Sequence, residues 1–140
     1  MVDVKALLPH REPFLFVDRI EKADGKEIVA YHRFNEQEWF FKGHFPGFPV
    51  VPGVILLETM AQCGGAGQRL YDGKQATVFY LATVDSVRFR RQVRPGEEVR
   101  VVVTNLRVSD SMIRQAGKAF VGEELAAEAQ WLCLRGPVQR

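Results

Sequence analysis

One acidic side chain interrupts an apolar segment of the sequence. Residues 54 to 61 read Val-Ile-Leu-Leu-Glu-Thr-Met-Ala, and Glu58 is the only ionisable group among them. Burial raises the pKa of a carboxyl group because desolvation disfavours the charged form, so such a group persists where it is paired or where its proton is used. We therefore take Glu58 as a candidate general acid. The alternative is that it reaches solvent at a helix edge or caps a backbone donor.

A histidine stands in a short, restrained loop ahead of this segment. His44 lies between Gly43 and Gly47, and Pro46 is in the same loop. Glycine lets a backbone approach closely, proline fixes its path, and a histidine held there can exchange protons near neutral pH. The alternative is an ordinary core or surface histidine. The spacing to Glu58 allows contact within one chain but does not demand it, and a dimer could bring one chain's histidine to the other's glutamate.

A backbone donor stands between these two residues. Gly53 follows Pro52, which suits the first turn of a helix. The N–H of Gly53 then has no partner within the helix and lies at the positive end of its dipole, so it can donate to an oxygen that gains negative charge. Base, acid and oxyanion donor thus fall within residues 44 to 58. Proton abstraction beside a thioester carbonyl requires that combination.

A loop and a helix must position these groups. The loop is dense in glycine and proline, at Gly43, Pro46, Gly47, Pro49, Pro52 and Gly53. From Gly53 to about Tyr71 no proline occurs, which predicts a helix, and its first turns are apolar nearly all round, which indicates burial on most sides. Gly64, Gly65 and Gly67 lower its helix propensity by roughly 1 kcal/mol each relative to Ala, a cost that another closely approaching backbone would explain.

The rest of the chain alternates as strands do. The strand-like segments are residues 14–20, 27–34, 77–91, 98–108, 112–121 and 124–135, with turn signals at 23–26, 95–97 and 122–123. A hairpin, a buried helix and a run of long strands predict one α+β domain over residues 1–140, with a curled antiparallel sheet wrapped around a single central helix. A second copy could join the exposed edges of such a sheet in a dimer.

Composition and charge exclude several classes of function. The chain is 46% apolar and 26% charged, as ordinary globular proteins are, and its net charge of +2 is far from the basic excess of proteins that bind nucleic acid non-specifically. No apolar run is long enough for a signal sequence or for the ~20 residues that span a bilayer. We expect a cytoplasmic protein without membrane insertion. Cys63 and Cys133 have no neighbouring metal ligands, and we expect both to be buried spectators.

Three stretches of the sequence carry a family resemblance. They read Leu-Pro-His-Arg-Glu-Pro-Phe-Leu-Phe-Val-Asp at 8–18, Gly-His-Phe-Pro-Gly-Phe-Pro-Val-Val-Pro-Gly-Val at 43–54 and Glu-Thr-Met-Ala-Gln at 58–62, with shorter matches at 87–90, 93–96 and 126–129. On these stretches the chain strongly resembles the hotdog-fold 3-hydroxyacyl-acyl carrier protein dehydratases of type II fatty acid synthesis. The resemblance covers essentially the whole chain.

The resemblance implies a role for each candidate residue. His44 is the catalytic histidine that removes a proton from C2 of the 3-hydroxyacyl chain, and Glu58, contributed by the other subunit of a dimer, helps the C3 hydroxyl to leave as water. The amide of Gly53 polarises the thioester carbonyl, and the carbonyl of Val50 orients the imidazole. Which of His44 and Glu58 delivers the proton to the hydroxyl stays open. No metal or redox cofactor is implied.

The resemblance also implies partners. Family members form dimers that often assemble into trimers of dimers, and the acyl chain enters an apolar tunnel along the dimer interface. We assign Phe79, Leu81 and Phe89 to that tunnel, with core packing as the alternative; an aromatic gate of the family matches Phe79 or the adjacent Tyr80. Acyl carrier protein is acidic, so it could dock on a basic cluster, which is formed by Arg88, Arg90, Arg91 and Arg94. An ordinary solvated strand face explains these arginines equally well.

Some residues of the matching stretches receive no catalytic role. His10 and Asp18 belong to the first stretch, and we interpret both as structural. Glu12 stands where the family commonly has an aromatic residue, and Thr59 where it commonly has alanine or another small residue. Neither touches the acid-base pair, although Thr59 could alter the polarity beside Glu58.

Three alternative functions remain at this point. The family's bifunctional dehydratase-isomerases carry Asp at the position of Glu58 and are generally longer. A hotdog thioesterase would hydrolyse acyl thioesters and does not need the His44 loop. A non-catalytic acyl-binding subunit would keep the tunnel and lose the chemistry, and the presence of both His44 and Glu58 argues against it.

Overall fold

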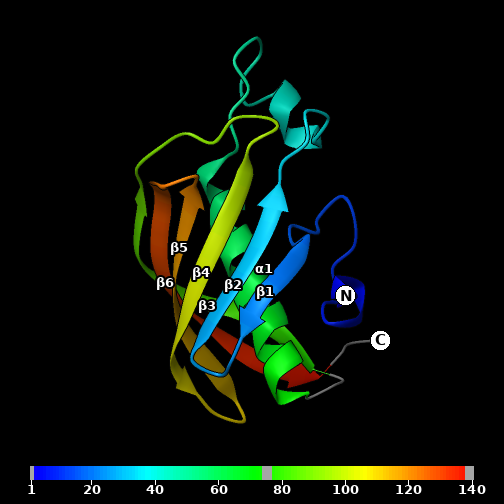
Figure 1. The fold of residues 1–140 in the computed structure, drawn as a ribbon, viewed down its shortest axis with the longest axis vertical. Coiled ribbons are helices and arrows are strands. Elements are labelled where there is room, and N and C mark those ends of the chain that lie inside the picture. The colour runs from blue at the N-terminus through cyan, green and yellow to red at the C-terminus, as the bar shows by residue number, and fades with distance from the viewer. Residues whose placement is uncertain (1, 74–76, 138–140) are drawn as a thin grey trace.

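In the part of the chain that the structure describes, six strands form one antiparallel sheet that curls around one long helix (Figure 1). The computed structural model describes residues 2–73 and 77–137. Its elements are the 3-10 helices η1 (Val4–Ala6) and η2 (Trp39–Lys42), the helix α1 (Gly53–Asp72), and the strands β1 (Arg19–Ala23), β2 (Glu27–Arg33), β3 (Thr77–Phe89), β4 (Glu98–Val108), β5 (Met112–Val121) and β6 (Glu124–Pro137). The strand order is β1-β2-β4-β5-β6-β3. The predicted hotdog fold is confirmed.

Alternation of buried and exposed side chains explains why the central strands form. In β4, Val99, Val101 and Val103 are completely buried, while the residues between them are partly exposed. This period of two places one face of the sheet against the helix and leaves the other outside. The bounds predicted for β4 and β5 agree with the structure, because both strands keep this alternation along most of their length.

The helix α1 lies inside the curve of the sheet. It begins after Pro52 and ends at Asp72, and Gly73, which has a left-handed φ of 67°, caps its C-terminus. A side chain at Gly64 or Gly67 would collide with Gln115 or Ile28 of the sheet. Side chains, and not another backbone as the glycine pattern predicts, therefore fill the space beside these glycines. Within the described residues no helix is both long and apolar enough to cross a membrane.

A chain of buried polar groups fixes the second half of α1 to the sheet. Trp131 Nε1 donates to Gln115 Oε1 at 3.1 Å, and Gln115 Nε2 donates to Asn105 Oδ1 at 2.8 Å and to the carbonyl of Gly64 at 3.2 Å. Asn105 Nδ2 in turn donates to Gln68 Oε1 at 2.8 Å. Buried polar groups of this kind are costly unless they are paired, so the network fixes how the helix sits in the sheet.

The first predicted strand begins later than the sequence suggests. Residues 14–18 lie outside β1, which begins at Arg19. The backbone N–H of Phe16 donates to Gln62 Oε1 at 2.8 Å, and the carbonyl of Phe14 accepts from Gln62 Nε2 at 3.1 Å. These backbone groups are satisfied by the helix and not by a neighbouring strand, so the prediction of a strand from residue 14 is wrong.

Both cysteines are free and buried, as the sequence predicts. Burial raises the pKa of the Cys63 thiol, and burial together with the nearby charge of Glu58 raises the pKa of Cys133 to about 12. A thiol reacts through its thiolate, so neither cysteine is a nucleophile near neutral pH.

Candidate active site

Glu58 lies on the second turn of α1 with its carboxyl group half-buried beside β3. Its side chain is 23% exposed. Burial raises the pKa of this carboxyl group, and a hydrogen bond from Gln62 opposes part of that rise. Desolvation therefore favours the neutral, proton-carrying form of Glu58, as a general acid requires.

Gln62 holds one oxygen of this carboxyl group in place. Its Nε2 donates to Glu58 Oε2 at 2.9 Å. The orientation of the amide is unambiguous, because Gln62 Oε1 accepts the backbone N–H of Phe16 and the NH₂ group must then point toward Glu58 and the carbonyl of Phe14. Glu58 Oε2 is consequently an acceptor, and the proton of the neutral acid resides on Oε1. The sequence predicts no role for Gln62, and the one signal it offers is the position of Gln62 four residues after Glu58 on the same helix face.

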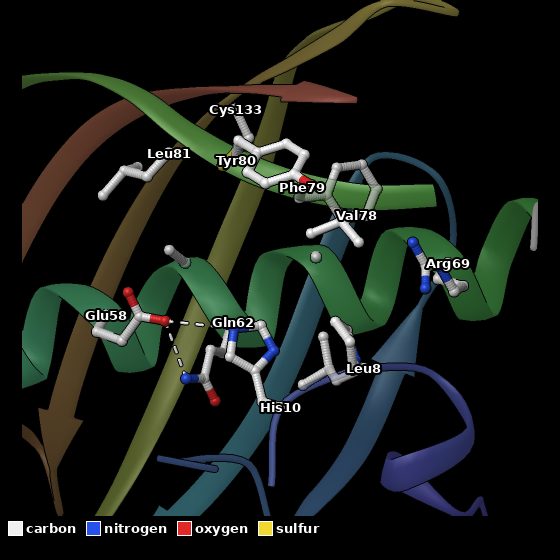
Figure 2. A pocket seen from close by; sticks show the side chains of 13 residues that line it. Leu8, His10, Glu58, Gln62, Arg69, Val78, Phe79, Tyr80, Leu81 and Cys133 are labelled. Atoms are coloured by element: carbon white, nitrogen blue, oxygen red, sulfur yellow. Dashed lines mark hydrogen bonds and ion pairs between the residues drawn. The ribbon is translucent and has the colours of Figure 1, made fainter. Parts of the chain in front are cut away.

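The Glu58 groove is a cavity of about 260 Å³ between α1, β3 and the N-terminal segment (Figure 2). Its lining residues are Leu8, Pro9, His10, Glu58, Ala61, Gln62, Gly65, Arg69, Val78, Phe79, Tyr80, Leu81 and Cys133. The predicted tunnel residues Phe79 and Leu81 thus lie in the same cavity as Glu58. Arg69 and Arg135 place their guanidinium groups 5.4 and 5.1 Å from the centre of the Phe79 ring, and Asp72, 3.0 Å from Arg135 Nη2, balances part of their positive charge.

His44 lies at a second cavity, near the start of α1. Its Nδ1 is 2.9 Å from the carbonyl oxygen of Val50, and its ring stacks on Phe45 with 4.1 Å between the centroids. A carbonyl oxygen only accepts hydrogen bonds, so Nδ1 carries the proton and Nε2 keeps its lone pair as the basic atom. Local hydrogen bonds close the loop, since Val50 N donates to the carbonyl of His44 at 2.9 Å and Phe48 N to that of Phe45 at 2.9 Å.

The His44 pocket has a volume of about 660 Å³ and includes the N-terminus of α1. Gly53 lines it together with His44 and Phe89. A Cβ atom on Gly53 would lie 2.9 Å from the Phe89 ring, so only glycine fits beneath this ring without displacing it. The third predicted tunnel residue, Phe89, is therefore in the His44 pocket and not in the Glu58 groove, and its side chain is 52% exposed in the single chain.

The two candidate catalytic residues do not meet within one chain. His44 and Glu58 line different cavities, and no hydrogen bond or ion pair joins them among residues 2–73 and 77–137. Thr59, beside Glu58, turns into the core, where its hydroxyl donates to the carbonyl of Ile55 at 2.7 Å. Its extra polarity is thus satisfied within the helix and does not reach the groove.

The predicted basic cluster is partly neutralised by acidic side chains. Arg90 Nε lies 2.6 Å from Glu128, and Arg91 makes two contacts of 2.9 Å with Glu97. Arg94 stacks on Phe48, with 4.3 Å from its guanidinium carbon to the ring centre. Arg88 is exposed and makes no hydrogen bond or ion pair within the described part of the chain.

Comparison with known proteins identifies the family. The FabA-like domain model matches residues 8–130. Relatives named 3-hydroxyacyl-[acyl-carrier-protein] dehydratase FabZ include that of Desulforamulus reducens, 44% identical over 93% of this chain and 94% of the relative, and that of Pelotomaculum thermopropionicum, 45% identical over 91% of each. The relative from Moorella thermoacetica is 41% identical over 92% of this chain and 91% of its own.

Solved structures support the fold. The dehydratase heterocomplex ApeI:P of Xenorhabdus doucetiae matches with a TM-score of 0.81 at 14% identity, covering 97% of this chain and 92% of that one. A mutant thioesterase of Pseudomonas aeruginosa matches with a TM-score of 0.63 at 15% identity, covering 86% and 81%. A dehydratase and a thioesterase thus share this architecture, so the fold alone does not distinguish the two activities. By its sequence, however, the chain belongs to the FabA-like family, among the 3-hydroxyacyl-[acyl-carrier-protein] dehydratases.

Proposed function

We propose that the chain is a cytoplasmic dehydratase that converts 3-hydroxyacyl-acyl carrier protein to the 2-enoyl thioester in fatty acid biosynthesis. One observation carries the proposal beyond family membership. The chain holds a carboxyl group whose pKa is raised by burial and an imidazole that lines a cavity with its Nδ1 held by the carbonyl of Val50, the two groups that elimination of water needs.

The proposed reaction balances as a simple elimination. His44 Nε2 takes the proton from C2, the electron pair of that C–H bond forms the C2–C3 double bond, and the C3–O bond breaks. Glu58 Oε1 gives its proton to the departing hydroxyl, which leaves as water. The Gly53 N–H donates to the thioester oxygen while it carries negative charge. The raised pKa of Glu58 is the reason for assigning the second proton to it and not to His44.

The reaction needs a second copy of the chain. Strand β3 pairs only with β6 among the described strands and is an edge of the sheet, 13 residues long. Its apolar side chains are exposed, with Leu81 at 41% and Phe89 at 52%. A long apolar edge strand is a template for pairing with another chain, so we place the dimer contact at β3.

Pairing of β3 with its own copy would unite the two cavities. Two identical strands that pair antiparallel about a twofold axis bring the first half of each opposite the second half of the other. The first half of β3, at Phe79 and Leu81, borders the Glu58 groove, and its last residue, Phe89, borders the His44 pocket. Each groove would then adjoin the His44 pocket of the other copy, and the site would contain one residue from each subunit.

Acyl carrier protein is the proposed source of the substrate. In the basic cluster, the guanidinium groups of Arg88 and Arg94 pair with no acidic side chain among the described residues. They are the better candidates to attract an acidic carrier domain, because Arg90 and Arg91 already pair with Glu128 and Glu97. The acyl chain would lie along Phe79 and Leu81.

Interconversion of 3-hydroxyacyl and trans-2-enoyl thioesters, followed by enoyl absorbance, tests the proposal. Wild-type protein is compared with His44→Ala, and thiol release is recorded in parallel. We expect interconversion by the wild type, its near-complete loss in the variant, and no thiol release. Thiol release without interconversion would show a thioesterase. If neither the enoyl absorbance changes nor thiol is released, the chain is a binding subunit.

A further inference from the structure

A second titratable side chain faces the carboxyl group of Glu58. His10 Nε2 lies 3.6 Å from Glu58 Oε2, and the two side chains are 26% and 23% exposed (Figure 2). His10 comes from the segment between η1 and β1, so the contact joins the N-terminal segment to the central helix. His10 Nε2 lies near the same oxygen, Oε2, that Gln62 holds, and Glu58 Oε1 is left facing the groove.

The surroundings of His10 indicate which nitrogen carries its proton. Burial, with a smaller contribution from the charge of Arg11, lowers the pKa of His10, so the neutral ring is favoured. Its Nδ1 is buried and has no hydrogen-bond partner within the described residues. A buried N–H without an acceptor is costly, so the proton belongs on Nε2, which faces Glu58.

The N-terminal segment is built to keep this ring in place. Arg11 Nη1 donates to the carbonyls of Leu8 at 2.9 Å and His10 at 2.6 Å, and Arg11 Nη2 donates to that of Lys5 at 3.2 Å. One guanidinium group thus gathers three backbone carbonyls around the turn that carries His10. The ring is held at the groove by this turn and not by a hydrogen bond of its own.

We propose that His10 is a positioning residue for Glu58: its Nε2–H donates to Oε2 of the carboxylate that forms when Glu58 releases its proton. At 3.6 Å the contact is looser than a hydrogen bond while the acid is neutral, and it shortens when the oxygen gains charge. Oε2 then accepts from Gln62 and His10 together, while Oε1 exchanges the proton with substrate. The proposal rests on the dehydratase function proposed above.

Few other groups compete for this role among the described residues. From α1, Gln62 faces the carboxyl group, and Arg69 lines the groove about 16 Å further along the helix. From β6, Cys133 lines the groove, and its pKa of about 12 keeps the thiol neutral. From β3, Tyr80 lines the groove, and its hydroxyl donates to the carbonyl of Pro137 at 3.3 Å. In the proposed dimer, the other subunit's histidine would be a further titratable neighbour.

The pH dependence of the hydration direction tests the role of His10. Hydration requires ionised Glu58, so its kcat/KM falls as the pH drops through the pKa of Glu58. Without the Nε2 donor the carboxylate is less stabilised and the pKa of Glu58 rises further. The acid limb of the pH profile, where kcat/KM falls, therefore moves to higher pH. We expect His10→Phe to lose about 10-fold in kcat/KM on the acid side, the effect of one hydrogen bond to a charged group. His10→Gln retains a donor near Nε2 and should recover most of the loss.

Controls separate this role from a structural one. His32→Gln changes a buried histidine that lies outside the groove and contacts Asp18 at 2.8 Å; it should lower stability and leave the limb in place. If the pH profiles of kcat/KM for His10→Phe and for wild type superpose, the inference is wrong, while the dehydratase function stands. If wild type shows no interconversion, the function fails, and NMR titration of the Glu58 carboxyl carbon decides the inference. There, equal midpoints in wild type, His10→Phe and His10→Gln would overturn it.

Discussion

The Glu58 groove and the His44 pocket hold their proton-exchanging groups in opposite ways. Glu58 lies in the smaller cavity and contacts Gln62, which is itself fixed by the backbone at Phe14 and Phe16. His44 lies in the larger cavity, and among the described residues the one hydrogen bond of its side chain goes to the carbonyl of Val50, six residues away. In the proposed mechanism the acid, which must keep its proton, is desolvated by distant parts of the chain, whereas the base, which must reach substrate, is oriented by its own loop. Each region would then be half of a site that two copies of the chain complete.

The largest expected effect tests whether the two regions act as halves of one site. His44→Ala and Glu58→Gln should each lower the rate about 10²- to 10⁴-fold, as removal of a general acid or base does. Dissociated and reassociated in equal amounts, the two variants should recover about a quarter of wild-type activity, because half of the dimers are mixed and each mixed dimer has one intact site.

The matched control for this recovery is a mixture in which no intact site can form. His44→Ala combined with the double variant His44→Ala/Glu58→Gln should remain inactive under the same reassociation protocol. If the first mixture also remains inactive while size measurements show that mixed dimers have formed, each site uses residues of a single chain. The proposed pairing through β3 would then be wrong.

The same contrast explains what could be predicted from the sequence. The His44 loop and Gly53 were recognisable because their glycines and prolines are close in the sequence, and β4 and β5 because their alternation is local. Gln62 and Phe16 are 46 residues apart, so no local pattern shows that the amide closes on the backbone there. For that reason the sequence wrongly predicts a strand over residues 14–18 and indicates no catalytic part for Gln62 or His10.

A smaller effect concerns the stability cost of burying the Glu58 carboxyl group. Burial raises the pKa of Glu58 in the folded chain above its unfolded value, so the folded state binds this proton more tightly. Stability must therefore fall as the pH rises from the ordinary glutamate value of about 4.3 through the folded pKa, and it stays reduced above it. Glu58→Gln removes this loss while its side-chain oxygen can still accept from Gln62. Thermal unfolding should show the variant a few degrees more stable at pH 7 to 8.

The pH dependence of that gain is the decisive part of the measurement. Below about pH 4 both proteins carry a neutral side chain at this position, so the difference should vanish. Glu123→Gln, which neutralises an exposed carboxylate in the turn between β5 and β6, serves as the control and should not reproduce this pH profile. A Glu58→Gln protein no more stable than wild type at pH 8 would mean that burial of the acid carries no cost.

The smallest effect concerns Arg88 and Arg94, the two arginines of the cluster whose guanidinium groups pair with no acidic side chain among the described residues. Arg88→Glu and Arg94→Glu should raise KM for carrier-linked substrate about 3- to 10-fold at low salt, with less effect at high salt, because exposed charges steer an acidic partner through a screened field. A short thiol mimic of the substrate should show no change in KM. Arg107→Glu, which alters an exposed arginine near the end of β4, should leave KM for carrier-linked substrate unchanged.

Arg91→Glu is a poorer probe, since it breaks the contacts with Glu97 and places two acids together. Equal effects of Arg88→Glu on both substrates would show that the arginine supports the fold or the acyl site. The proposed docking of an acidic carrier on Arg88 and Arg94 would then be wrong.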